Sequence, residues 1–151
     1  MIRRRVPAFI LIAAGVAIVG LLFLLLLPSE ARQATNIVDS FYSYEQASEF
    51  SSSWDLFHPS MHQKFSKGTY IQDRAHVFMN HFGVDTFSYS LSRPTKRVNW
   101  KMTDDGEPFE VVYEVVVTQV YNGKYGKFEL VQPVYVAEDA EGWALMWDYQ
   151  E

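Results

Sequence analysis

An uncharged apolar run from Val6 to Leu27 constrains this chain more than any other feature. At about 1.5 Å per residue, a helix over this run is about 33 Å long, enough to cross a hydrocarbon core of about 30 Å. Three arginines at positions 3–5 precede the run, and the next charged residue is Glu30. Because basic residues stay on the cytoplasmic side, we expect a cytoplasmic tail at residues 1–5, a transmembrane helix at residues 6–27 and a C-terminal part outside the cytoplasm.

A cleaved signal peptide is the alternative, because Ser29 and Ala31 are small residues at the two positions that signal peptidase reads. The apolar core of a signal peptide spans about 7–15 residues, which is shorter than this run. We therefore favour an anchor that is not cleaved. Residues 28–34 then form a short polar linker, and the domain at residues 35–151 lies close to the membrane surface.

Charge and cysteine content narrow the classes of function. Of the 13 lysine and arginine residues three lie in the tail, which leaves 10 against 18 acidic residues. This balance argues against a nucleic-acid partner, which needs a basic surface. The chain has no cysteine, so disulfides, thiol catalysis and cysteine–zinc sites are excluded.

Apolar residues three and four positions apart predict helices after residue 34. The first carries Ile37, Phe41 and Tyr44 on one face, with Thr35 or Asn36 as its N-cap. The second is a short, serine-capped helix that carries Trp54 and Phe57. We expect Pro59 to break it and a turn to close on Phe65.

The third predicted helix lies in the segment SKGTYIQDRAHVFMNHFG, residues 66–83. Its inner stripe includes a charged residue among apolar ones, at Tyr70, Ile71, Arg74, Val77, Phe78 and Phe82. Gly83 is expected to end this helix.

Beyond Gly83 the apolar period changes from about 3.6 to 2, which predicts about five antiparallel strands. Asp105–Gly106 and the segment NGKYG, residues 122–126, are predicted hairpin turns. The β-branched run from Val111 to Tyr121 is the predicted central strand, and GWALMWDY, residues 142–149, is the last strand. The predicted fold class is α+β, with an N-terminal transmembrane helix and about three helices covering one face of a curved sheet.

This order of elements ends in a tryptophan-rich strand with Trp143, Leu145, Trp147 and Asp148, and it resembles the nuclear-transport-factor-2-like (cystatin-like) cone superfamily. More narrowly, it is similar to the membrane-anchored, noncatalytic N-terminal domain of penicillin-binding proteins of the methicillin-resistance type. The resemblance covers residues 35–151 and implies a cone-shaped domain. The superfamily contains enzymes, ligand binders and scaffolds alike. Because no Ser-x-x-Lys motif occurs and no transpeptidase domain follows Glu151, we do not expect that activity.

The closing strand is predicted to be a lid on the core. Alternation puts Trp143, Leu145, Trp147 and Tyr149 on the helix side, against Trp54, Phe57 and Phe78, and it puts Ala144, Met146 and Asp148 on the other side. A ligand-accepting aromatic cavity is the alternative to a filled core. Its candidate ligand-contact residues are Trp54, Tyr70, Arg74, Trp100, Glu114 and Trp147.

The remaining polar clusters favour surface roles. His58 and His62 are four positions apart, but Pro59 disturbs the helix that would bring them to one face, and we expect no metal and no cofactor. Arg93, Lys96 and Arg97 are read as protection of a strand edge, with contact to anionic lipid headgroups or wall polymers as the alternative. The acidic segment TDDGE, residues 103–107, is read as a turn.

Asp73, Arg74 and His76 form the densest ionisable cluster near the expected cavity. We expect a surface ion pair there, with Arg74 pairing near Asp73 or with Glu114. If the domain is an enzyme, Glu114 or Asp73 is the nominated general base.

The predicted function is a noncatalytic binding or interaction module of the bacterial cell envelope, anchored by residues 6–27, with an envelope protein or a cell-wall component as its partner. One alternative is an accessory inner-membrane subunit of a secretion or conjugation channel. Another is a small-molecule-binding or isomerase-like enzyme of the cone fold.

Overall fold

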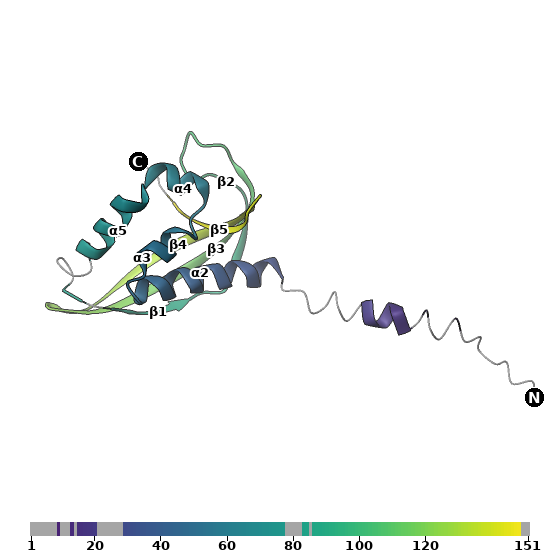
Figure 1. Ribbon diagram of the computed structural model, residues 1–151, viewed down its shortest axis with the longest axis horizontal. Coiled ribbons are helices and arrows are strands. Elements are labelled where there is room, and N and C mark those ends of the chain that lie inside the picture. Colours follow the sequence, from purple (N-terminus) through teal and green to yellow (C-terminus); the bar gives the residue numbers. More distant parts are fainter. Residues whose placement is uncertain are drawn as a thin grey trace, which may run out of the picture.

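The computed structural model describes residues 9, 13, 15–20, 29–77, 83–84 and 86–148. As predicted, the fold is α+β, with helices followed by an open antiparallel sheet (Figure 1). In these described residues, no helix combines the length and apolar character that a membrane crossing requires. The predicted span at residues 6–27 lies largely outside them.

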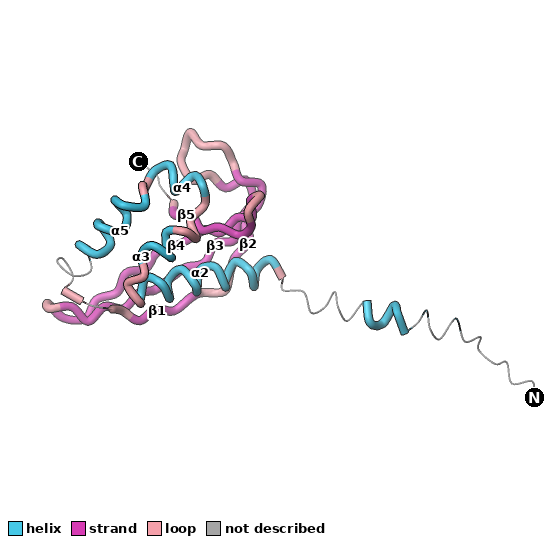
Figure 2. Tube along the Cα trace, viewed as in Figure 1, coloured by secondary structure: helices cyan, strands magenta, loops and turns pink. Residues whose placement is uncertain are grey.

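Four helices are found between residues 29 and 77, and they lie on one side of the sheet (Figure 2). They are α2 (Glu30–Gln46), α3 (Phe50–Trp54), α4 (Pro59–Lys64) and α5 (Lys67–His76). The longest, α2, runs along the sheet and contacts four of its strands. This is one helix more in the segment than the sequence predicts.

The first helix begins earlier than predicted. Ser29 is its N-cap, with an extended backbone and a side chain that accepts a hydrogen bond from the Arg32 amide. Thr35, the expected cap, lies inside the helix and donates from its hydroxyl to the Ala31 carbonyl. The predicted linker at residues 28–34 is therefore helical from Glu30 onward, because serine caps a helix as well as threonine does.

The predicted break at Pro59 is instead a helix start. His58 is the N-cap of α4, and Pro59 is its first residue. Proline is favoured there because its missing N–H has no acceptor in the first turn and its φ angle already suits a helix. The third predicted helix corresponds to α5, which ends at His76. Its expected continuation through Phe78 and Phe82 lies outside the described residues.

The sheet contains β1 (Ser88–Leu91), β2 (Thr95–Trp100), β3 (Phe109–Gly123), β4 (Gly126–Asp139) and β5 (Gly142–Trp147). The order is β1-β3-β4-β5, with β2 also paired to β3, so β1 and β2 follow each other along one edge of the central strand. The predicted central strand and the turn between residues 122 and 126 are confirmed. The β2–β3 connection, residues 101–108, is longer than the tight hairpin expected around Gly106.

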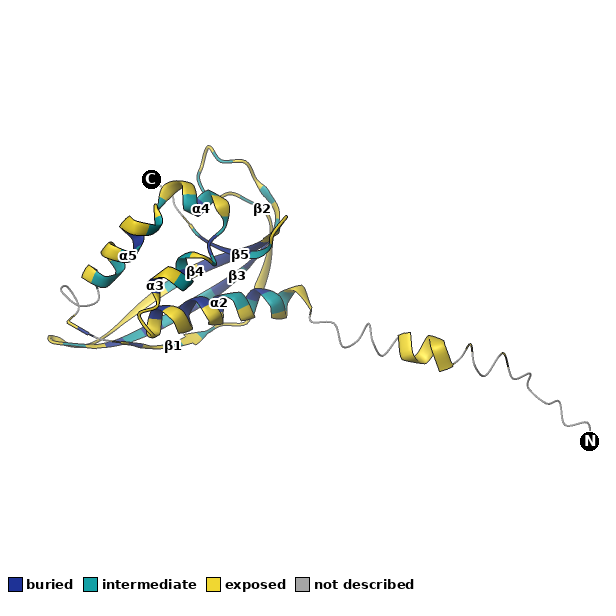
Figure 3. Ribbon diagram, in the orientation of Figure 1, coloured by how far each residue is buried: buried dark blue, intermediate teal, exposed yellow. Residues whose placement is uncertain are grey.

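The core lies between the helices and the sheet (Figure 3). Leu145 of β5 is fully buried and faces the helices as predicted. Met146, on the other side of β5, is also fully buried. Its neighbour Tyr135 is stacked on Trp100, with ring centroids 4.2 Å apart. Aromatic cover on the second face explains why both sides of this strand are apolar.

Candidate functional site

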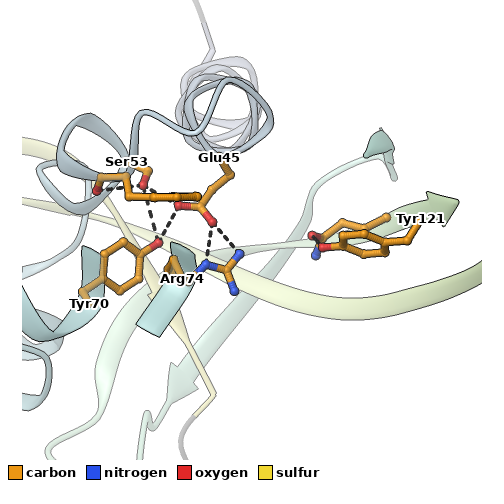
Figure 4. Close-up of polar contacts among 7 residues, drawn as sticks. Glu45, Ser53, Tyr70, Arg74 and Tyr121 are labelled. Carbon is orange, nitrogen blue, oxygen red and sulfur yellow. Dashed lines mark hydrogen bonds and ion pairs between the residues drawn. The ribbon is translucent and has the colours of Figure 1, made fainter. Parts of the chain in front are cut away.

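The described part of the chain buries a charged cluster between the helices and the sheet (Figure 4). Its centre is Glu45, which is 1% exposed and lies near the end of α2. The residue belongs to the inner face of that helix, which is otherwise apolar and consists of Ala34, Val38, Phe41, Tyr42 and Glu45. The four-and-three spacing of this face brings the carboxylate into the core instead of into water.

Three side chains donate hydrogen bonds to this carboxylate. Arg74 of α5 donates from Nε to Oε2 at 2.6 Å and forms a second contact through Nη2. Tyr70 of α5 donates its hydroxyl to Oε1 at 2.7 Å. Ser53 of α3 donates to the same oxygen at 2.5 Å. The cluster thus ties α2, α3 and α5 together through one acid.

The electrostatics of the cluster keep Tyr70 neutral and Arg74 charged. Burial, together with the nearby charge of Glu45, raises the pKa of the Tyr70 hydroxyl well above its ordinary value. Burial lowers the pKa of the Arg74 guanidinium, but the charge and hydrogen bond of Glu45 outweigh it, and the pKa is raised overall. A neutral tyrosine and a charged arginine therefore face this carboxylate at every physiological pH.

A second polar layer lies toward the sheet. Tyr121 of β3 donates its hydroxyl to Gln119 Oε1 at 2.5 Å, and both residues are 1% exposed. Tyr42 is equally buried, but its hydroxyl has no hydrogen-bond partner among the described residues. The buried indole nitrogen of Trp147 also lacks a partner by strict hydrogen-bond geometry. It nevertheless lies close enough to the Tyr42 hydroxyl to offset part of the rise that burial causes in the pKa of that group.

Aromatic rings fill the space around the cluster. The Trp147 ring lies 4.9 Å from the Phe57 ring and 6.0 Å from the Phe41 ring, and it contacts both edge-on. The Tyr70 ring lies 5.3 Å from the Phe57 ring. Such edge-to-face contacts pack rings densely and leave little room between them.

The structure brings three of the six candidate residues together: Tyr70, Arg74 and Trp147. It places Trp54 beside them, where its N–H donates to the Phe65 carbonyl at 2.9 Å and its ring stacks on His62. The predicted packing of Trp147 on Phe57 is confirmed, and the predicted contact with Phe78 lies outside the described residues.

Trp100 and Glu114 do not belong to the cluster. Trp100 stacks on Tyr135 at the end of β2. Glu114 accepts a hydrogen bond from Arg97 Nε at 2.8 Å across the β2–β3 pair. The expected pairing of Arg74 with Asp73 or Glu114 is wrong, because Glu45 is the acid that reaches Arg74 inside the core.

Sequence reasoning missed Glu45, although a signal was present. Phe41 and Val38 lie four and seven positions before it, so Glu45 falls on the apolar face of its helix. Arg74 lies on the apolar stripe of the third predicted helix in the same way. Opposite charges on the inner faces of two helices predict a buried ion pair, since neither charge is tolerated there alone.

Two described pockets lie away from this cluster. One, of about 320 Å³, is lined by residues of α2 and four strands, including Glu30, Lys96 and Trp143. The other, of about 270 Å³, lies beside α4 and β5 and includes His62 and Asp139. Within the described ranges, no group of three or more histidine, aspartate and glutamate side chains is placed to hold a metal.

Neither a protein-family model nor a curated protein sequence matches the chain.

Proposed function

We propose that the chain is a membrane-anchored, noncatalytic binding module of the bacterial cell envelope. In this proposal residues 6–27 are the anchor, and the domain outside the cytoplasm is a cone of the nuclear-transport-factor-2-like kind. The observation that carries the noncatalytic part is the state of Glu45. An acid–base enzyme needs a carboxylate or imidazole that its substrate can reach. Glu45 is enclosed, and both of its oxygens already accept hydrogen bonds.

The other nominated bases support an enzyme no better. Glu114 is paired with Arg97 on the face of the sheet away from the cluster. Asp73 lies on the exposed side of α5. The rings of Phe41, Phe57 and Trp147 occupy the interior in which a cone-fold enzyme would bind its substrate.

The surface supports a binding role at the β3–β4 hairpin. Tyr125, at its turn, is 92% exposed, and Val131 of β4 is 60% exposed. The Lys124 ammonium lies 4.9 Å from the centroid of the Tyr125 ring. Exposed aromatic and apolar side chains are typical of contact surfaces between proteins.

The test is photo-crosslinking of the full-length chain in its own membrane. A benzophenone amino acid replaces Tyr125, and in a control chain it replaces Glu49, the exposed N-cap residue of α3. We expect discrete adducts from position 125 and few from position 49. Mass spectrometry of the adducts then separates a single envelope protein from a large channel assembly.

Adducts at neither position, or equal yields at both, would contradict a binding surface at the hairpin. The noncatalytic part has its own test in the variant Glu45→Gln. This variant should keep the position-125 adducts as long as the domain stays folded.

A further inference from the structure

The first half of β4 has an open edge. β5 pairs with β4 only from Val134 to Asp139, and no other described strand pairs with residues 127–131 on that side. Leu130 and Val131 are 42% and 60% exposed there. The outer edge of β5 is different, because the Leu145 amide and carbonyl bond to Leu56 and His58. Among the described residues, the outer edge of β5 is therefore covered, and no strand covers this part of β4 (Figure 1).

The turn fixes which backbone groups point outward from this edge. Lys124 and Tyr125 form a two-residue turn between Gly123 and Gly126, so these glycines are a hydrogen-bonded pair. Strict alternation then directs the N–H and C=O groups of Lys127, Glu129 and Val131 away from β3. Among the described residues, no strand takes up this row of donors and acceptors.

Pro133 ends this row. It belongs to the same outward-facing series, so its missing N–H interrupts the free edge and not the ladder with β3. Val116, the residue opposite it, bonds to Ser92 on its other side through both its N–H and its C=O. The open edge therefore extends from Lys127 to Val131, with a turn at one end and a proline at the other.

We propose that this edge pairs with the same edge of a second copy of the chain, as antiparallel strands with Phe128 opposite Phe128. In this register Lys127 of each copy faces Glu129 of the other. Opposite charges directly across a strand pair are favourable, and like charges are not. The next register toward the C-terminus places Glu129 opposite Glu129. The one after that places Lys127 opposite Pro133, which cannot donate.

A contact of five residues per copy is small compared with the roughly 1,000 Å² that a stable interface needs, so the dimer is transient. Anchoring in one membrane raises the local concentration of the second copy and favours pairing. Antiparallel pairing places the starts of the two α2 helices at opposite ends of the joined sheet. Both anchors then reach one membrane when the strands run along its surface.

Disulfide trapping of the full-length chain in its membrane tests the register, because the native chain has no cysteine. Residues facing each other in a non-hydrogen-bonded antiparallel pair have Cα atoms about 4.5 Å apart, which suits a disulfide. Phe128→Cys should therefore form a dimer on oxidation. Leu130→Cys is the matched control, since its two copies would lie about 13 Å apart along the strands. Val98→Cys, an exposed residue on β2, measures random collision.

We expect about tenfold more dimer from Phe128→Cys than from either control, given these separations. Equal yields from Phe128→Cys and Val98→Cys, or from Phe128→Cys and Leu130→Cys, would overturn the proposal.

A charge exchange keeps the test independent of Phe128, whose ring stacks on Tyr121. Fluorescence energy transfer is measured between donor-labelled and acceptor-labelled copies of the chain in the same vesicles. For Lys127→Glu this transfer should fall to the background level. The double variant Lys127→Glu/Glu129→Lys should restore it, because each pair again joins opposite charges. Unchanged transfer in Lys127→Glu would also overturn the proposal.

The proposal rests on the proposed binding function but fails separately from it. Suppose that the adducts at position 125 contain a different envelope protein and that Phe128→Cys stays monomeric. This result would contradict self-pairing but would still support the binding module. An absence of both adducts and dimer would remove both.

Discussion

Single residues decide whether the interior of this domain is a reaction site or a structural joint. Glu45 is a fully buried acid, and a carboxylate in such a place is tolerated only when donors replace the water it has lost. Arg74, Tyr70 and Ser53 supply these donors from two other helices. The arrangement holds three helices in register and leaves the acid no lone pair positioned for a substrate.

Breaking the ion pair from one side should cost far more than replacing both partners. Arg74→Met leaves a buried carboxylate without its cation, and we expect a loss of about 3–5 kcal/mol in the free energy of unfolding. Glu45→Gln/Arg74→Met removes the charge but keeps an acceptor for Tyr70, so it should be more stable than Arg74→Met alone. Urea unfolding of the full-length chain in detergent measures both. If the loss of unfolding free energy in the double variant equalled the sum of the losses in the two single variants, the two side chains would not be coupled.

The two buried tyrosines near Glu45 should respond differently to the loss of their hydroxyls. Tyr70→Phe removes a hydrogen bond to a carboxylate and should cost about 1.5–3 kcal/mol. Tyr42→Phe removes a buried hydroxyl that has no partner in the described residues, and it should be neutral or slightly stabilising. Thermal unfolding compares them directly. A cost for Tyr42→Phe as large as that for Tyr70→Phe would indicate that the Tyr42 hydroxyl does have a hydrogen-bond partner, such as the neighbouring Trp147 indole N–H.

Buried tyrosines also predict how stability depends on pH. Burial raises the pKa of Tyr121 from 10.0 to about 12, and the hydrogen bond to Glu30, with burial, raises the pKa of Tyr113 to about 12. The folded protein keeps these protons where the unfolded chain loses them. The contribution is therefore complete below pH 10 and is lost as the pH rises toward 12.

Unfolding free energies measured at steps from pH 8 to pH 11 should be flat at first and then fall. The variant Tyr121→Phe should fall less steeply. Equal slopes for the two proteins above pH 10 would contradict the assignment to this residue.

At the scale of elements, the sequence predicted which segments are helices and which are strands, but it misplaced the residues at which several helices begin. The change of apolar period after Gly83 was enough to predict an antiparallel sheet with β3 at its centre. The starts of α2 and α4 were misplaced, because Ser29, Thr35 and Asn36 are all acceptable caps and Pro59 is compatible with either a break or a first turn. Local propensity leaves such alternatives open, and packing decides between them.

Glycines in a turn and in a helix offer a matched test at this scale. Gly126 closes the β3–β4 turn with a φ angle of 114°, which side chains other than glycine rarely adopt. Gly126→Ala should cost about 1–3 kcal/mol for this strain. Gly68 lies in the first turn of α5, and a Cβ there meets nothing within 4 Å. Gly68→Ala should therefore stabilise by roughly 0.5–1 kcal/mol. Thermal unfolding of both variants measures these effects. A neutral Gly126→Ala would contradict the turn assignment.

At the scale of the whole molecule, the candidate site was only half predictable. Tyr70, Arg74 and Trp147 were named because they lie on inner faces of predicted elements. Glu45 was missed because finding it requires knowing that α2 and α5 meet, which no local pattern states. Trp100 and Glu114 are candidate ligand contacts in the sequence that the structure does not bring to the cluster, because alternation along a strand does not tell which face of a sheet the helices cover.

We propose that one membrane span holds this domain outside the cytoplasm. Because the chain has no cysteine, a single introduced thiol reports its own location. In Tyr125→Cys the thiol occupies a position that is 92% exposed, and in Ile2→Cys it lies in the predicted cytoplasmic tail.

Labelling of whole cells with a membrane-impermeant maleimide measures the topology directly. We expect that Tyr125→Cys is labelled in intact cells, that Ile2→Cys is labelled only after lysis, and that both proteins stay in the membrane pellet after alkaline extraction. Labelling of Tyr125→Cys only after lysis, or release of the chain by alkali, would contradict it.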